Sequence, residues 1–192
     1  MSNPIQTKWN NIYQDESPGS RLVDRVLGEN AHLLPTNGTA LDLACGLAAN
    51  GIFLAEKGLD VQAWDISDQV VRKLNEFAQQ KDISLTASTQ DLSTAVFPEA
   101  AFDVIVVAHF LERDLSDKII SALKPNGLLF CQTFTKDVTP TYTGPSNPDF
   151  RLAENELLQM YSGLRLVVYR EESLLGDIQQ GLRNEVLYIG RK

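Results

Sequence analysis

The segment Thr39-Ala-Leu-Asp-Leu-Ala-Cys-Gly-Leu-Ala-Ala-Asn-Gly51 decides the fold that we expect for this chain. A short apolar run containing Asp42 stops at the small residues 44–46, and an apolar segment of helical length follows at 48–57. A strand, a tight turn and a helix in this order form half of a nucleotide-binding crevice, in which small residues let the backbone approach the ligand. Asp65 ends the next apolar run, about 20 residues further on, where a carboxylate meets a ribose diol. The spacing predicts a site for an adenosine-containing cofactor.

The composition predicts one soluble globular domain over residues 1–192. The chain is 43% hydrophobic and 22% charged, and a chain of this length buries about 70% of its unfolded surface. No apolar run approaches the ~20 residues of a membrane span, and the N-terminus lacks the apolar stretch of a signal peptide. We therefore expect no membrane association. Cys45 and Cys131 both lie in apolar segments, which favours reduced thiols and a cytoplasmic location.

Charge and metal-ligating residues narrow the class of partner. Two cysteines and two histidines, His32 and His109, are too few for an evident metal site, so no metal is expected. A formal net charge of -8 argues against nucleic acid, whose binding depends on basic surfaces. A small molecule is the expected partner. The sequence leaves monomer and homodimer open.

Apolar runs alternate with helical patterns along most of the chain and predict a mostly parallel sheet covered by helices on both sides. The last two strand-like runs are joined without a helical crossover, so they should pair antiparallel. The expected class is α/β: a Rossmann-like three-layer αβα sandwich with a mostly parallel seven-stranded sheet and an antiparallel C-terminal strand. The expected strands are 41–44, 59–65, 83–87, 102–108, 128–134, 164–169 and 185–190; the expected helices include 49–57, 67–78, 114–123 and 154–161.

Two further segments flank this pattern. Residues 1–35 should form a helical cap, with one amphipathic piece carrying Trp9 and Tyr13 and a second helix that Ser20 caps. The polar stretch 135–152 is longer than most ordinary connections, and loops of this length are usually functional or disordered. We interpret it as a substrate lid, in which Tyr142, Phe150 and Arg151 are the most suggestive residues.

Over nearly its whole length the chain resembles the class I S-adenosylmethionine-dependent methyltransferases. Within that superfamily it is most similar to the small bacterial tellurite-resistance (TehB-like) methyltransferases. The motifs that carry the resemblance are Lys8–Tyr13, Asp42–Gly46, Asp65, Gln90-Asp91-Leu92, Phe102–Ile105 with the following His109-Phe110-Leu111, and Leu123–Leu128. The turn departs from the three glycines that are common in the superfamily, because its positions are Ala44, Gly46 and Ala48. We expect alanine to cost little there if its φ angle stays negative.

The resemblance implies a role at the cofactor for each of these residues, and a structural role is the alternative in each case. Asp42 would hold the amino group of the cofactor or cap the loop, and Ala44 and Gly46 would let the backbone approach the methionyl part. Asp65 would accept both ribose hydroxyls, since one carboxylate can take two hydrogen bonds, or be a solvated strand-end acid. The other predicted cofactor-binding residues are Ile66 and Leu92 beside the adenine, Asp91 at its amino group or at a helix N-cap, Trp9 and Tyr13 over the sulfonium or in the core, and Ala108 and His109 at the end of the central strand.

His109 is also the one candidate catalytic residue. It titrates near neutral pH, so it would remove a proton from the acceptor or only line the pocket. The expected reaction is transfer of a methyl group from S-adenosylmethionine to a small-molecule nucleophile, with S-adenosylhomocysteine as the product. The resemblance suggests a thiol or a chalcogen oxyanion as acceptor. A cofactor-binding protein without catalysis and a nicotinamide-dependent oxidoreductase are the alternatives, and the missing Gly-x-Gly-x-x-Gly pattern counts against the second.

Overall fold

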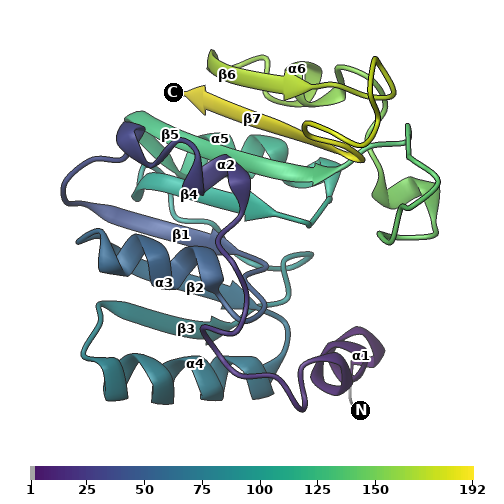
Figure 1. Cartoon of the computed structure of the whole chain (residues 1–192). Coiled ribbons are helices and arrows are strands. Elements are labelled where there is room, and N and C mark those ends of the chain that lie inside the picture. The colour runs from purple at the N-terminus through teal and green to yellow at the C-terminus, as the bar shows by residue number, and fades with distance from the viewer. Residues whose placement is uncertain (1–2) are drawn as a thin grey trace.

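The computed structural model describes residues 3–192, which contain one seven-stranded sheet (Figure 1). The strand order is β3-β2-β1-β4-β5-β7-β6, and neighbours from β3 to β5 pair in parallel. β7 runs antiparallel to both β5 and β6, which confirms the predicted sheet. The strands are β1 (Thr39–Leu43), β2 (Asp60–Asp65), β3 (Leu85–Thr89), β4 (Phe102–Ala108), β5 (Leu123–Phe134), β6 (Arg165–Glu171) and β7 (Glu185–Arg191).

Helices cover both faces of the sheet and complete the three predicted layers. α2, α3 and α4 pack on one face, and α5 and α6 pack on the other (Figure 1). In the part of the chain that the structure describes, no helix has the length and apolar character needed to cross a bilayer. The helices are α1 (Pro4–Ile12), α2 (Arg25–Gly28), α3 (Ala49–Glu56), α4 (Asp68–Lys81), α5 (Ser116–Ala122) and α6 (Glu156–Met160).

β4 shows how the sequence pattern builds the core. Val104 and Val106 point into the cluster beneath α2, α3 and α4, whereas Ile105 and Val107 point into the cluster beneath α5 and α6. All four side chains are buried, as expected for a parallel strand that has helices on both faces. The central strand is therefore fixed on both sides, and its carboxyl end is a rigid support for His109.

The predicted start of the second helix is wrong. α2 begins at Arg25 rather than after Ser20, and Asp24 is its N-terminal flanking residue. The Asp24 backbone N–H donates to Asn50 Oδ1 (3.0 Å), and the Asn50 amide donates to Asp24 Oδ2 (2.8 Å). These two bonds hold Asp24 in an extended conformation, and Leu22 is 93% exposed, so its side chain adds no core contact that would favour an earlier helical turn.

The start of the fifth strand also differs from the prediction. β5 begins at Leu123 rather than at residue 128, so residues 124–127, which lie between the expected helix and the expected strand, form the irregular first part of the strand. The end of the chain causes this extension, because the backbone of Lys192 exchanges hydrogen bonds of 3.0 Å with Asn126 and Gly127. α5 and α6 are each shorter than the predicted helices at 114–123 and 154–161.

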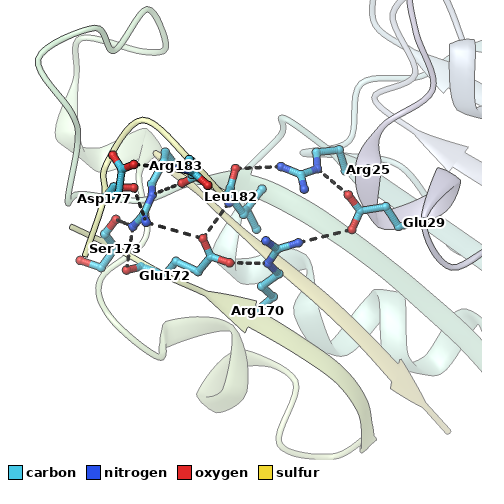
Figure 2. Close-up of polar contacts among 10 residues, drawn as sticks. Arg25, Glu29, Arg170, Glu172, Ser173, Asp177, Leu182 and Arg183 are labelled. Carbon is cyan, nitrogen blue, oxygen red and sulfur yellow. Dashed lines mark hydrogen bonds and ion pairs between the residues drawn. The ribbon is translucent and has the colours of Figure 1, made fainter. Parts of the chain in front are cut away.

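Ion pairs attach α2 to the connection between β6 and β7 (Figure 2). Arg170 lies 2.6 Å from Glu172 and 3.6 Å from Glu29, and Arg25 donates to the carbonyl of Gly181 at 3.1 Å. Exposed ion pairs of this kind each contribute little stability. They form a connected set, however, and it holds the segment that carries Asp24 beside the C-terminal strands.

Candidate functional site

The turn between β1 and α3 has an unusual backbone. Ala44, Gly46 and Ala48 have φ angles of 54°, 51° and 52°, so all three lie in the left-handed region. The condition under which alanine would cost little, a negative φ, is therefore not met at Ala44 or Ala48. A left-handed alanine costs roughly 1–2 kcal/mol, and such strain is concentrated at functional sites because the surrounding structure must maintain it. Gly46 lies at the centre of this turn, and because it has no side chain another group can approach its backbone closely.

Asp42 ties β1 to the start of α3. Its carboxylate is 2% exposed and accepts a hydrogen bond from the Gly51 backbone N–H at 2.8 Å. Burial raises the pKa of Asp42 well above its ordinary value, and the bond from Gly51 opposes part of that rise. A Cβ atom at Gly51 would lie 3.0 Å from Asp42 Oδ2, so the helix approaches the carboxylate this closely only with glycine there. The geometry matches the loop-capping alternative, and contact with the cofactor amino group stays a prediction.

Asp65 joins the turns that follow β1 and β2, where the cofactor is predicted to bind. One of its oxygens accepts from the Gly46 N–H and the other from the Ser67 N–H, both at 2.8 Å. The side chain is only 6% exposed, and burial raises its pKa while the backbone donors oppose the rise. Because a carboxylate offers about four acceptor positions, two bonds leave capacity for hydroxyl donors. The predicted ribose ligand and the predicted methionyl turn are thus in direct contact.

Hydrogen bonds attach α1 and its N-cap to the segments that follow β2 and β3. Gln6 donates to the carbonyl of Ile66 at 3.0 Å, Asn10 donates to Asp68 at 2.8 Å, and Asn3 donates to Asp91 at 3.2 Å. The helix therefore spans the ends of β2 and β3, where the adenosine was predicted. The second oxygen of Asp91 accepts two bonds from Ser93 and shapes the local turn, and Leu92 is buried in the core.

Tyr13, just after α1, packs against Gly46. Its ring stacks on Trp9 with centroids 5.6 Å apart, and its hydroxyl would lie 2.7 Å from a Cβ atom at Gly46. Burial, and secondarily the Asp65 charge, raises the pKa of Tyr13 to about 12, so the phenol stays protonated. The Lys73 ammonium donates to the carbonyls of Tyr13, Gln14 and Glu16 at 2.7–2.8 Å and fastens this segment to α4.

His109 lies at the carboxyl end of β4 with a left-handed φ of 53°. Its Nε2 is 3.0 Å from Glu185 Oε1, and its Nδ1 is 3.4 Å from Asp24 Oδ1. Partial burial lowers the pKa of the imidazole, but the hydrogen bond to Glu185 and the charges of Asp24 and Glu185 more than offset this, so the pKa is raised. The neighbouring Ala108 pairs with Gln132 of β5.

Sequence reasoning missed Asp24, Gln132 and Glu185. His109 and Glu185 are 76 positions apart, and Gln132 and Glu185 are 53 apart, so no local motif could connect them. The expected position of Gln132 at the carboxyl end of a central strand was the one available signal.

The segment 135–152 runs past His109. Thr135 and Leu152 form a bridge that closes its base. The Phe134 ring lies 5.0 Å from His109 and 5.9 Å from Tyr142, and the Arg151 guanidinium lies 5.6 Å from the Tyr142 ring. Tyr142 and Arg151, two of the three suggested lid residues, are therefore connected to His109 through a series of ring contacts. Phe150 is the exception, because it is 54% exposed and none of these stacked contacts includes it.

The strand order, the left-handed turn after β1 and the acid at the end of β2 define the class I methyltransferase fold. The family described as "Tellurite resistance protein TehB" matches residues 8–185, and the chain belongs to this family. A Haemophilus influenzae protein named "Probable S-adenosyl-L-methionine-dependent methyltransferase TehB" is 30% identical over 149 residues, which is 73% of this chain and 50% of that protein. The chain thus spans about half the length of the curated relatives it matches.

Solved structures agree on the fold. TehB from Haemophilus influenzae aligns with a TM-score of 0.69 at 22% identity, over 96% of this chain and 67% of that one. A geranyl diphosphate C-methyltransferase from Streptomyces coelicolor, solved with S-adenosyl-L-homocysteine, aligns with a TM-score of 0.67 at 16% identity, over 100% and 99% of the two chains.

Proposed function

We propose that this protein binds S-adenosylmethionine at the crevice between the ends of β1 and β2 and transfers its methyl group to a small-molecule nucleophile. The observation that carries the proposal is the contact between Asp65 and the Gly46 N–H, which brings a carboxylate with spare acceptor capacity to a strained small-residue turn. Membership of the TehB family supports the same cofactor.

The residues present fit this cofactor. We expect Asp65 to bind the ribose hydroxyls and Ile66 and Leu92 to lie beside the adenine. The stacked pair of Trp9 and Tyr13 suits a sulfonium because cations are attracted to aromatic faces. When bound, the cofactor supplies an electrophilic methyl group. The protein then has to orient two reactants and exclude water, which α1 does from one side and the segment 135–152 from the other.

We also propose the chemical class of the methyl acceptor. The family name supports a chalcogen oxyanion, and a thiol is the second candidate of similar size. His109 and Tyr142, which both pack on the Phe134 ring, are the residues that we expect beside the entering acceptor.

A transfer assay with tritium in the methyl group of S-adenosylmethionine tests the reaction. We expect labelled product and S-adenosylhomocysteine in equal amounts with at least one acceptor from a set of small thiols, selenite and tellurite. Tight cofactor binding without transfer to any acceptor would favour the non-catalytic alternative instead.

A further inference from the structure

We propose that Glu185 and Gln132 position His109 to take a proton from the methyl acceptor, and that the acceptor is a neutral thiol-class molecule that arrives protonated. This inference rests on the proposed function and narrows its acceptor.

A chain of hydrogen bonds connects His109 to the protein core. Glu185 Oε1 lies 3.0 Å from Nε2 of His109, and Glu185 Oε2 accepts from the Gln132 amide at 2.6 Å. The Gln132 oxygen in turn accepts from the Val26 backbone N–H at 2.7 Å. Gln132 is 3% exposed, so this chain is anchored in the core and leaves Glu185 one orientation. A base that is oriented by a third group in this way is the usual arrangement in proton-transfer sites.

The two ring nitrogens of His109 have different partners. Glu185 is an acceptor, so it holds the proton on Nε2 and leaves the lone pair of the neutral ring on Nδ1. Nδ1 faces Asp24 at 3.4 Å, longer than a hydrogen bond, and Asp24 already binds Asn50 through its other oxygen. The His109 side chain is 37% exposed, so the ring is open to an incoming molecule, and Nδ1 carries the free lone pair.

Charged side chains from several elements act on the His109 ring. Asp24 from the N-terminal segment and Glu185 from β7 both favour the protonated ring, while Arg21 disfavours it and Arg25 acts on Glu185. Phe134 of β5 packs on the ring without a charge. Two carboxylates beside one imidazole repel an anionic acceptor, but they stabilise the imidazolium that forms when a neutral acceptor gives up its proton.

The proposed reaction needs only the acceptor, the methyl donor and His109. The S–H proton of the acceptor moves to His109 Nδ1, and the sulfur lone pair forms the bond to the methyl carbon. The bond from that carbon to the sulfonium breaks, and its electron pair stays on the sulfur of the departing S-adenosylhomocysteine. The imidazolium later releases its proton to water.

The test compares Glu185→Gln with the wild-type protein and uses Glu154→Gln, an exposed carboxylate before α6, as the matched control. The acceptors are an alkyl thiol, protonated at neutral pH, and an electron-poor aryl thiol, already ionised there. We expect Glu185→Gln to slow methylation of the alkyl thiol by about tenfold or more and not to slow methylation of the aryl thiol, because the substitution also removes one of the two carboxylates that repel this anion. His109→Asn should give the same split, because asparagine tolerates the left-handed conformation.

Two readouts do not depend on turnover. NMR titration should show that the pKa of His109 falls in Glu185→Gln and is unchanged in Glu154→Gln. Calorimetry should show S-adenosylmethionine binding unchanged in Glu185→Gln. Equal slowing of both thiols, or an unshifted His109 pKa, would overturn the positioning role. If the wild-type protein binds the cofactor but methylates oxyanions and neither thiol, the acceptor class is wrong while the proposed function stands. If no cofactor binds, the proposed function itself fails.

Discussion

Replacing Gly46 by alanine tests how closely Tyr13 packs on the turn after β1. The new Cβ atom would lie 2.7 Å from the Tyr13 hydroxyl oxygen and 3.2 Å from Cζ. Real Cβ atoms do not approach other atoms within 3.0 Å, so the ring must move. Tyr13 is buried against Trp9 and beneath Arg21, and its carbonyl is one of the three that Lys73 holds, so the movement would loosen the N-terminal segment.

The cost has two parts. A left-handed alanine costs about 1–2 kcal/mol, and the stiffer unfolded chain returns about 0.4–1 kcal/mol of this. Displacing one buried large side chain adds about 1.5–3 kcal/mol. We therefore expect Gly46→Ala to lower the free energy of unfolding by about 2–4 kcal/mol, which corresponds to a fall in Tm of about 4–16 °C for a chain of this size.

Urea denaturation measures the change, and Gly176→Ala is the matched control. Gly176 also has a left-handed φ, 69°, but a Cβ atom there would meet nothing within 4 Å. Gly176→Ala should lose stability only through backbone strain, so the difference in the free energy of unfolding between the two variants isolates the contact with Tyr13. Equal destabilisation by both substitutions would refute the close packing of Tyr13 on the turn.

Three further predictions concern the same region. Ala44→Gly relieves a left-handed alanine, so it should stabilise the protein by about 0.5 kcal/mol in urea denaturation, and a clear loss would contradict the φ of 54°. The pKa of Asp42 is raised, so the folded protein holds the carboxyl proton more tightly than the unfolded chain does. The free energy of unfolding therefore falls as the pH rises from the ordinary aspartate pKa through the raised value. Asp42→Asn should flatten this fall in denaturation curves measured between about pH 4 and pH 8, whereas an unchanged slope would show that Asp42 does not cause it. Lys73→Met removes the donor to three carbonyls after α1, so proteolysis should cut the N-terminal segment faster than in Lys81→Met, whose ammonium lies over Phe77. Equal rates would argue against the fastening.

Much of the fold was predictable because its signals are local. The unbroken apolar run in β4 predicts a strand buried on both faces, and Ser67 accepts the Val70 N–H as a helix cap at the expected position. The closeness of Gly46 and Asp65 was predictable for the same reason, since both belong to turns that follow adjacent strands. The structure adds their direct hydrogen bond.

The remaining features depend on contacts between distant residues. Nothing near Ser20 indicates that Asn50 holds Asp24 extended and delays α2. The left-handed angles of Ala44 and Ala48 follow from the path of the turn between β1 and α3 and not from their side chains, because alanine alone favours a negative φ. The surroundings of His109 come from the N-terminal segment and from β7, which only the folded chain brings together.

Calorimetric titration with S-adenosylmethionine, S-adenosylhomocysteine and NADH tests whether this crevice is the cofactor site. Asp65→Ala removes the proposed ribose ligand, and Asp60→Ala, an exposed acid at the start of β2, is its control. We expect micromolar binding of the first two ligands to the wild-type protein and to Asp60→Ala, loss of both in Asp65→Ala, and no binding of NADH. Binding of NADH alone, or full retention of S-adenosylmethionine binding by Asp65→Ala, would contradict the proposed site.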